Sequence, residues 1–189
     1  MSLLFSPPPF RPRQSGPVAL AVIGVLLALL SAASAGSSYT SANPPKTGPT
    51  VPGSRAMVRG GIAHAPEDAP ASVKRAIWAT NFLTRKPYVW GGGHAGFYDK
   101  GYDCSGTVSF LLRHAGVLSC PAGSGEFTRY GQGGRGRWIT VYARNGHVFA
   151  TVAGLRLDTS DMRGGDEGPR WRTASRSMSG FTARHPAGL

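Results

Sequence analysis

Cys104 is the residue best suited to chemistry, because it stands where a glycine-rich segment gives way to an apolar helical pattern. Apolar side chains recur at helical spacing after it, Asp103 suits the N-cap, and Gly116 ends the run. The thiol is therefore predicted in the first turn of a helix. Unpaired backbone N–H groups and the helix dipole favour an anion there, and the thiolate is the nucleophilic form of cysteine. The alternative is a buried, inert cysteine.

A cysteine nucleophile needs a base, and the chain has five histidines. His114 lies further along the same predicted helix, about 15 Å from the thiol at 1.5 Å per residue, which is too far. His94 lies in the glycine-rich segment and is a second candidate. His147 is the best placed by its sequence pattern, because it begins a predicted strand after the turn signal Asn145-Gly146.

Three segments rich in β-branched and aromatic residues, separated by turn signals, are predicted as antiparallel strands: 138–143, 147–152 and 155–158. A two-residue turn at Ala153-Gly154 would place His147 and Asp158 on one face of the sheet, on a diagonal. The carboxylate is then close enough to orient the imidazole, whereas a shift of one residue would separate them. The alternatives are a polar strand end for His147 and a turn residue for Asp158.

Three motifs in this order resemble the NlpC/P60 family of cell-wall cysteine peptidases: PYVWGG at 87–92, DCSG at 103–106 and GHV at 146–148. The resemblance spans about Ser72 to Ser160. It implies an α+β fold, with a papain-like NlpC-type core in which the nucleophile helix packs on an antiparallel β-sheet. It also implies hydrolysis of peptide bonds in bacterial peptidoglycan, typically between D-glutamate and a diamino acid, with no metal and no cofactor.

By this resemblance Cys104 is the nucleophile, His147 the base, and Asp158 the residue that orients the imidazole. The same resemblance assigns Tyr88 to the oxyanion, and Asp103 and Ser105 to contacts with the substrate peptide. Trp90, Gly91 and Gly92 are further substrate-binding candidates by residue type, with a core position for Trp90 and a plain flexible loop for the glycines as the alternatives. Tyr88 matches a tyrosine that assists the oxyanion, and the glycines would let the backbone approach the substrate closely.

Several features depart from the family pattern. Thr107 stands where Phe or Leu is frequent, and Asp158 is a less usual third residue than His, Asn or Gln. Residues 161–189 have no counterpart in the family core. They are predicted to be irregular apart from a short strand near Phe181.

The N-terminal region carries the pattern of an export signal. The apolar run Val18–Leu30 is followed by Ala33-Ser34-Ala35, which is typical of cleavage before Gly36. An N-terminal membrane anchor is the alternative for residues 1–35. Either predicts an exported protein, in the periplasm or in the extracellular space and cell wall. Residues 36–69 are rich in Ser, Pro and Gly and are predicted as a flexible tether, which leaves 70–189 as one peptidase domain.

The charge of the chain bears on its partners. Lys and Arg outnumber Asp and Glu by 21 to 9, giving a formal net charge of +12. An exported basic domain suits an anionic cell-wall polymer or membrane surface, besides the peptide stems of peptidoglycan, and the export signal argues against nucleic acid. Solubility alone is the alternative explanation of the charge. The oligomeric state is not predicted.

Other chemistries for the thiols are less well supported by the sequence. The helix after Cys104 would hold it away from Cys120, so a disulfide is disfavoured. A zinc site is disfavoured because the sequence lacks close ligand pairs. A wall amidase or transacylase on the same fold, and a catalytically silent basic wall-binding domain, are the alternatives to a peptidase.

Overall fold

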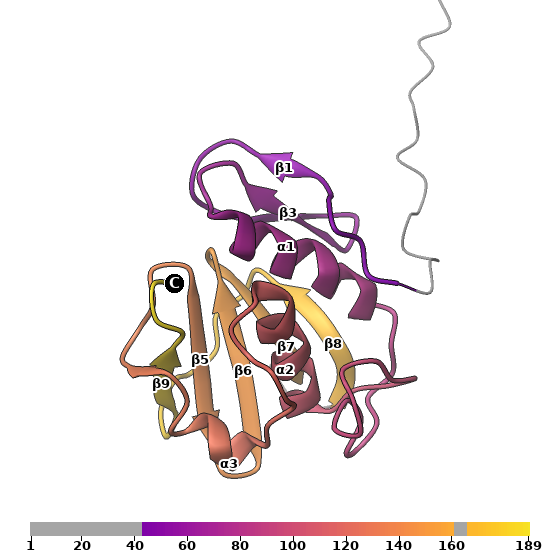
Figure 1. Ribbon diagram of the computed structural model, residues 1–189, viewed down its shortest axis with the longest axis vertical. Coiled ribbons are helices and arrows are strands. Elements are labelled where there is room, and N and C mark those ends of the chain that lie inside the picture. The colour runs from indigo at the N-terminus through magenta and orange to yellow at the C-terminus, as the bar shows by residue number, and fades with distance from the viewer. Residues whose placement is uncertain (1–42, 161–165) are drawn as a thin grey trace, which may run out of the picture. The chain divides into compact units, whose positions relative to one another are not determined.

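The structure, a computed structural model, describes residues 43–160 and 166–189, which belong to one compact unit of mixed α+β architecture (Figure 1). Their strands form a three-stranded sheet, ordered β1-β3-β2, and a six-stranded sheet, ordered β4-β9-β5-β6-β7-β8. In chain order the elements are β1 (Thr50–Val51), β2 (Met57–Arg59), β3 (Ile62–Pro66), α1 (Ala71–Thr80), η2 (Asn81–Leu83), α2 (Cys104–Ala115), α3 (Ser124–Phe127), β4 (Gln132–Gly133), β5 (Ile139–Arg144), β6 (His147–Val152), β7 (Leu155–Ser160), β8 (Asp166–Arg172) and β9 (Thr182–His185). The predicted α+β class is confirmed.

Within the described ranges, no helix has the length and apolar character needed to cross a membrane. The predicted signal segment lies outside these ranges.

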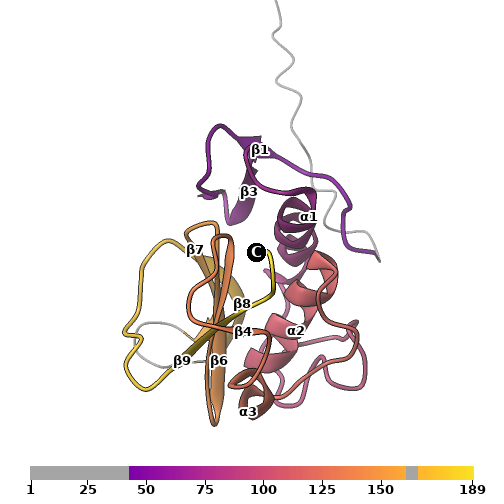
Figure 2. The same ribbon diagram turned by 60° about the vertical axis from the view of Figure 1, so that its left-hand side comes forward.

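The six-stranded sheet is built on the consecutive antiparallel strands β5, β6 and β7. Val152 pairs with Leu155 across the turn, which is the register predicted from the sequence. Figure 2 shows α1 and α2 on one side of this sheet. On that side the buried side chains of Val148, Ala150 and Leu157 join the core that contains the apolar residues of α2. The alternation of β6 therefore turns His147 and Phe149 to the other face.

Helix α2 has the two ends that its sequence predicts. Asp103 is the N-cap, and its Oδ1 accepts the backbone N–H of Gly106 at 2.7 Å. Gly116 ends the helix in the left-handed conformation with φ of 81°, which glycine adopts without steric cost. Cys104 is consequently fixed as the first residue of the helix.

The prediction of a flexible tether over residues 36–69 is wrong for residues 50–66, which form the three-stranded sheet. β1 pairs in parallel with β3, and β2 pairs with it in antiparallel fashion. Ala63 and Ala65 of β3 are fully buried in the core that includes α1, and the Asn81 side chain bonds both the N–H and the C=O of Ala63. Small apolar residues suffice here because the strand packs closely on a helix. The remainder of the predicted tether before residue 43 lies outside the described residues.

The prediction that residues 161–189 are mostly irregular is also wrong in part. A strand does follow Phe181, as β9, and it pairs with β5 and β4. No sequence pattern predicted β8, which pairs with β7 through Asp158↔Arg170 among other positions. Figure 2 shows the segment between β8 and β9 on the side of the sheet opposite α2. That segment therefore covers the face to which His147 belongs.

Candidate active site

Cys104 lies at the N-terminus of α2 with 8% of its surface exposed. It forms no disulfide, and neither does the exposed Cys120, in agreement with the sequence prediction. The capping of α2 by Asp103 sets the position of the thiol. A free thiol at this place is near backbone N–H groups that favour an anion.

His147 and Asp158 meet on one face of the β6–β7 hairpin, as the predicted register requires. The distance from His147 Nε2 to Asp158 Oδ1 is 3.1 Å, and the Asp158 side chain is fully buried. Asp158 Oδ1 also accepts the Ser160 backbone N–H at 3.1 Å and the Ser160 hydroxyl at 3.2 Å. Two adjacent strands thus hold the carboxylate in a single orientation toward the imidazole.

The Cys104 side chain lies close enough to the His147 imidazole to act on its pKa. Burial lowers the pKa of His147, but hydrogen bonds and charges from Asp158 and Cys104 outweigh it and raise the pKa to about 9. Nε2 faces Asp158, so Nδ1 is the nitrogen available to the thiol. Near neutral pH the site therefore favours an imidazolium held between the Asp158 carboxylate and the sulfur of Cys104.

Asp158 is held in its ionised form by several donors. Burial raises the pKa of Asp158, but hydrogen bonds from His147, Arg176 and the Ser160 backbone N–H outweigh it and lower the pKa below the usual value. Because the carboxylate keeps its charge, it stabilises a positive imidazole rather than taking its proton.

Arg176, which lies between β8 and β9, is a component of the site that the sequence analysis missed. Its Nη1 donates to Asp158 Oδ2 at 2.7 Å and to Ser160 Oγ at 3.0 Å, and lies 3.1 Å from His147 Nε2. The guanidinium also lies over the rings of Phe149 and Phe181, at 5.1 and 5.5 Å from their centroids. No local pattern marks this arginine, because its segment reaches the site only through the pairing of β8 and β9.

The glycine-rich segment is fastened to the start of α2 by Asp103. Oδ2 of Asp103 accepts the Gly91 N–H at 3.1 Å, while Asp103 donates its own N–H to the Gly92 carbonyl at 3.2 Å. A Cβ at Gly92 would lie 2.3 Å from the Gly101 carbonyl oxygen, so this position requires glycine for backbone packing. Gly91 has φ of 74° and open space around a Cβ, which makes its requirement conformational.

The remaining residues expected at the site lie around this segment. Ser105 is buried, and its hydroxyl donates to Asp103 Oδ1 at 3.1 Å. His94 Nε2 lies 3.1 Å from both Asp103 Oδ1 and Ser105 Oγ. Tyr88 forms a bridge with Tyr102, which leads into α2, whereas Trp90 is 84% exposed. The structure thus brings the three expected catalytic residues together and places Asp103 and Ser105 in a neighbouring polar network.

Among the described residues, no group of three or more His, Cys, Asp or Glu side chains is arranged to hold a metal ion.

Comparisons with known proteins find little sequence similarity. No protein-family profile matches the chain, and no curated protein matches it. Among solved structures, the crystal structure of an NlpC/P60 family protein from Bacillus cereus ATCC 10987 is similar, with a TM-score of 0.45 and 17% sequence identity. The match covers 60% of this chain and 39% of that protein, so the chain spans well under half of that relative.

Proposed function

We propose that this chain is an exported cysteine hydrolase that cleaves peptide bonds in bacterial cell-wall peptidoglycan, between D-glutamate and a diamino acid. The observation that carries the proposal is the His147–Asp158 hydrogen bond of 3.1 Å, beside a Cys104 thiol that acts on the pKa of His147 and lies at a helix N-terminus. The substrate class rests on the PYVWGG, DCSG and GHV motifs that resemble the NlpC/P60 family. On this basis the α+β fold is a papain-like NlpC-type core.

The nucleophile is the Cys104 thiolate. The raised pKa of His147, about 9, keeps the imidazole protonated near neutral pH, and a thiolate beside it is stabilised as an ion pair. The thiolate attacks the carbonyl carbon of the scissile amide and forms a C–S bond. The carbonyl oxygen becomes an oxyanion. In the proposed mechanism, the Cys104 backbone N–H and the Tyr88 hydroxyl stabilise it.

Collapse of the tetrahedral intermediate breaks the C–N bond. His147 donates its proton to the leaving amine, and Asp158 orients the ring throughout. Water then attacks the thioester and gives a proton to His147, which releases the carboxylic acid and restores the thiolate–imidazolium pair. The step needs no metal or cofactor.

The remaining roles concern substrate binding. Trp90, which is largely exposed, would contact the peptide stem of the substrate. Gly91 and Gly92 would keep the backbone next to Trp90 free of side chains, so that the substrate can approach it closely. Asp103 and Ser105 would shape this part of the substrate-binding site from their buried positions next to Cys104. The net positive charge would favour attachment to an anionic wall polymer or membrane surface.

Digestion of purified peptidoglycan under reducing conditions tests the proposal, with the released fragments identified by mass spectrometry. We expect the same peptide fragments from the wild type and from Cys120→Ala, the matched control that removes the other free cysteine, and none from Cys104→Ala. The fragment masses identify the bond. Release by Cys104→Ala would refute the nucleophile, cleavage at the sugar-linked amide would indicate an amidase, and sedimentation with the wall without release would favour a binding domain.

A further inference from the structure

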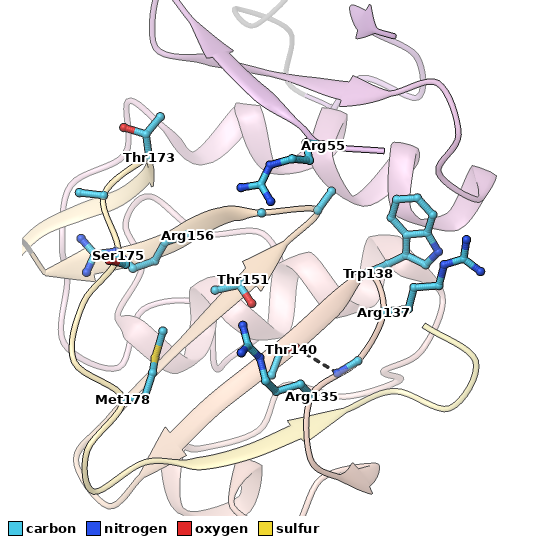
Figure 3. Close-up of a pocket in the computed structure, with 14 residues that line it drawn as sticks. Arg55, Arg135, Arg137, Trp138, Thr140, Thr151, Arg156, Thr173, Ser175 and Met178 are labelled. Carbon is cyan, nitrogen blue, oxygen red and sulfur yellow. Dashed lines mark hydrogen bonds between the residues drawn. The ribbon is translucent and has the colours of Figure 1, made fainter. Parts of the chain in front are cut away.

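A second polar site lies on the sheet face opposite α2, next to the buried Asp158 of the candidate active site. It is a pocket of about 380 Å³, and its lining contains four arginines, Arg55, Arg135, Arg137 and Arg156. Hydroxyl groups line the floor and one wall, from Thr140, Thr151, Thr173 and Ser175, and no acidic residue belongs to the lining. Figure 3 shows these side chains above the strands. A concave surface whose charged residues are all cationic attracts anions.

Arg156 is the residue that distinguishes this pocket from an ordinary basic surface. Only 3% of it is exposed, yet none of its three guanidinium nitrogens has a hydrogen-bond partner among the described residues. The carboxylate paired with it is that of Asp158, with Nη1 at 3.6 Å from Oδ2, which is beyond hydrogen-bond distance, and the positive charges of Arg172 and Arg176 also act on it. Buried donors without acceptors are costly, so an anion that accepted from Arg156 would remove an unfavourable feature of the free protein.

The backbone beside two further arginines of the lining is held by hydrogen bonds. Arg55 precedes Ala56, whose N–H donates to the Ala153 carbonyl at 2.9 Å in the β6–β7 turn. Arg135 precedes Gly136, whose N–H donates to Thr140 Oγ1 at 3.1 Å. In Figure 3 the guanidinium groups of Arg55 and Arg135 extend from two sides over the strip that carries the threonines.

Arg137 has a different role from the other three arginines. Its guanidinium lies over the Trp138 ring, at 5.4 Å from the centroid, and Figure 3 shows it directed away from Arg55 and Arg135. The ligand-binding set therefore consists of Arg55, Arg135 and Arg156.

We propose that this pocket binds a phosphate group, as a monoester or diester, between Arg55, Arg135 and Arg156. These three arginines of the lining come from three elements, namely the β1–β2 connection, the β4–β5 connection and β7. A tetrahedral anion with several acceptor oxygens can bond donors from three directions at once, whereas a planar carboxylate engages one fork well. The threonine hydroxyls supply additional donors. This inference does not depend on the proposed hydrolysis.

Calorimetric titration of the full-length protein with inorganic phosphate at low ionic strength tests the proposal. We expect saturable binding that weakens at least about tenfold in Arg135→Gln and in Arg55→Gln, since each removes a charged hydrogen bond. Both arginines are exposed, so their replacement leaves the core intact. Arg85→Gln is the matched control, because Arg85 is also exposed but lies outside the pocket, and its affinity should equal that of the wild type.

Three outcomes would overturn the proposal: no phosphate binding, equal weakening by Arg85→Gln, or affinity for acetate equal to that for phosphate. Arg156→Met gives a further test, with folding checked by thermal unfolding, and wild-type affinity in that folded variant would also overturn it. Glycerol phosphodiesters and vesicles containing phosphatidylglycerol distinguish the source of the phosphate. Binding of vesicles indicates a lipid headgroup, and binding of soluble esters alone indicates a free or polymer phosphate.

Discussion

Two histidine–aspartate pairs lie near Cys104, and their local geometry is nearly the same. His147 Nε2 and His94 Nε2 each lie 3.1 Å from an aspartate Oδ1, of Asp158 and Asp103 respectively. Each ring nitrogen is also near a serine hydroxyl two residues beyond its aspartate, at 3.3 Å for the first pair and 3.1 Å for the second. Distance alone therefore does not distinguish a catalytic pair from a structural one.

The surroundings of the two carboxylates distinguish the two histidine–aspartate pairs. Asp158 is fully buried. Its Oδ2 accepts a hydrogen bond from Arg176, and its Oδ1 faces the His147 imidazole. Asp103 instead accepts the backbone N–H groups of Gly91 and Gly106 and caps α2. Against the effect of burial, Asp158 and Cys104 raise the pKa of His147 to about 9. These surroundings support the proposed catalytic role of His147 and Asp158, whereas Asp103 holds the glycine-rich segment against the start of α2.

The largest expected difference between the pairs is in catalysis. His147→Ala should lower the rate of peptide release from peptidoglycan by about 10³-fold, because it removes the base and the acid of the proposed mechanism. His94→Ala should lower it less than about tenfold. The rates are measured on soluble wall fragments by chromatography. Equal losses in the two variants would mean that the pairs share the catalytic role.

Replacement of the two aspartates should also distinguish the two pairs, with a smaller effect on the catalytic rate than replacement of the histidines. Asp158→Asn should lower kcat about 10²-fold, because it removes the charge that orients the imidazole. It should also lower the unfolding temperature, because His147 and Arg176 lose their buried counter-charge. Asp103→Ala should lower the free energy of unfolding by about 1–2 kcal/mol, as expected for a lost N-cap. Thermal unfolding and steady-state kinetics on both variants check this. A folded, fully active Asp158→Asn variant would contradict the assignment.

The pH dependence of stability sharpens the comparison further. The pKa of His147 is raised from 6.5 to about 9, so its protonated form is favoured in the folded state. Its contribution is fully present below pH 6.5 and is lost as the pH rises to about 9, with a total on the order of 2 kcal/mol. Urea unfolding of the wild type and His147→Gln from pH 6 to 9.5 measures it. The difference between them should shrink with rising pH, and a constant difference would refute the ion pair.

The smallest expected effect concerns Arg176, which has no counterpart at the His94–Asp103 pair in the described chain. We expect Arg176→Gln to lower kcat about tenfold with little change in KM, and Arg176→Lys to recover part of it. Loss of the positive charge should also raise the pKa of His147, measured by NMR titration. A loss of stability with an unchanged titration would indicate a purely structural arginine.

Local sequence patterns were sufficient for much of the proposed site. The capping residues of α2 and the two-residue turn between β6 and β7 are encoded within a few positions, so Cys104, His147 and Asp158 could be placed correctly relative to their elements. The side-chain period of two in a strand then fixed the shared face of His147 and Asp158.

The features that were not predicted depend on pairing between distant segments. β1 pairs with β3 in a region whose composition is typical of a linker, and its burial depends on α1. Arg176 reaches Asp158 across an interval of 18 positions because β8 returns along β7. Neither contact leaves a period in the sequence. Arg156 looked like an ordinary strand residue, and only the fold shows its buried, unpaired guanidinium.

The most direct test of the account is the alkylation rate of the two cysteines at pH 6, measured peptide by peptide with iodoacetamide and mass spectrometry. Cys120 is exposed and Cys104 is buried, so access alone would make Cys120 the faster. The account predicts that Cys104 reacts faster, as a thiolate paired with His147, and that His147→Ala removes this advantage. Slower reaction of Cys104 in the wild type, or an unchanged rate in His147→Ala, would contradict it.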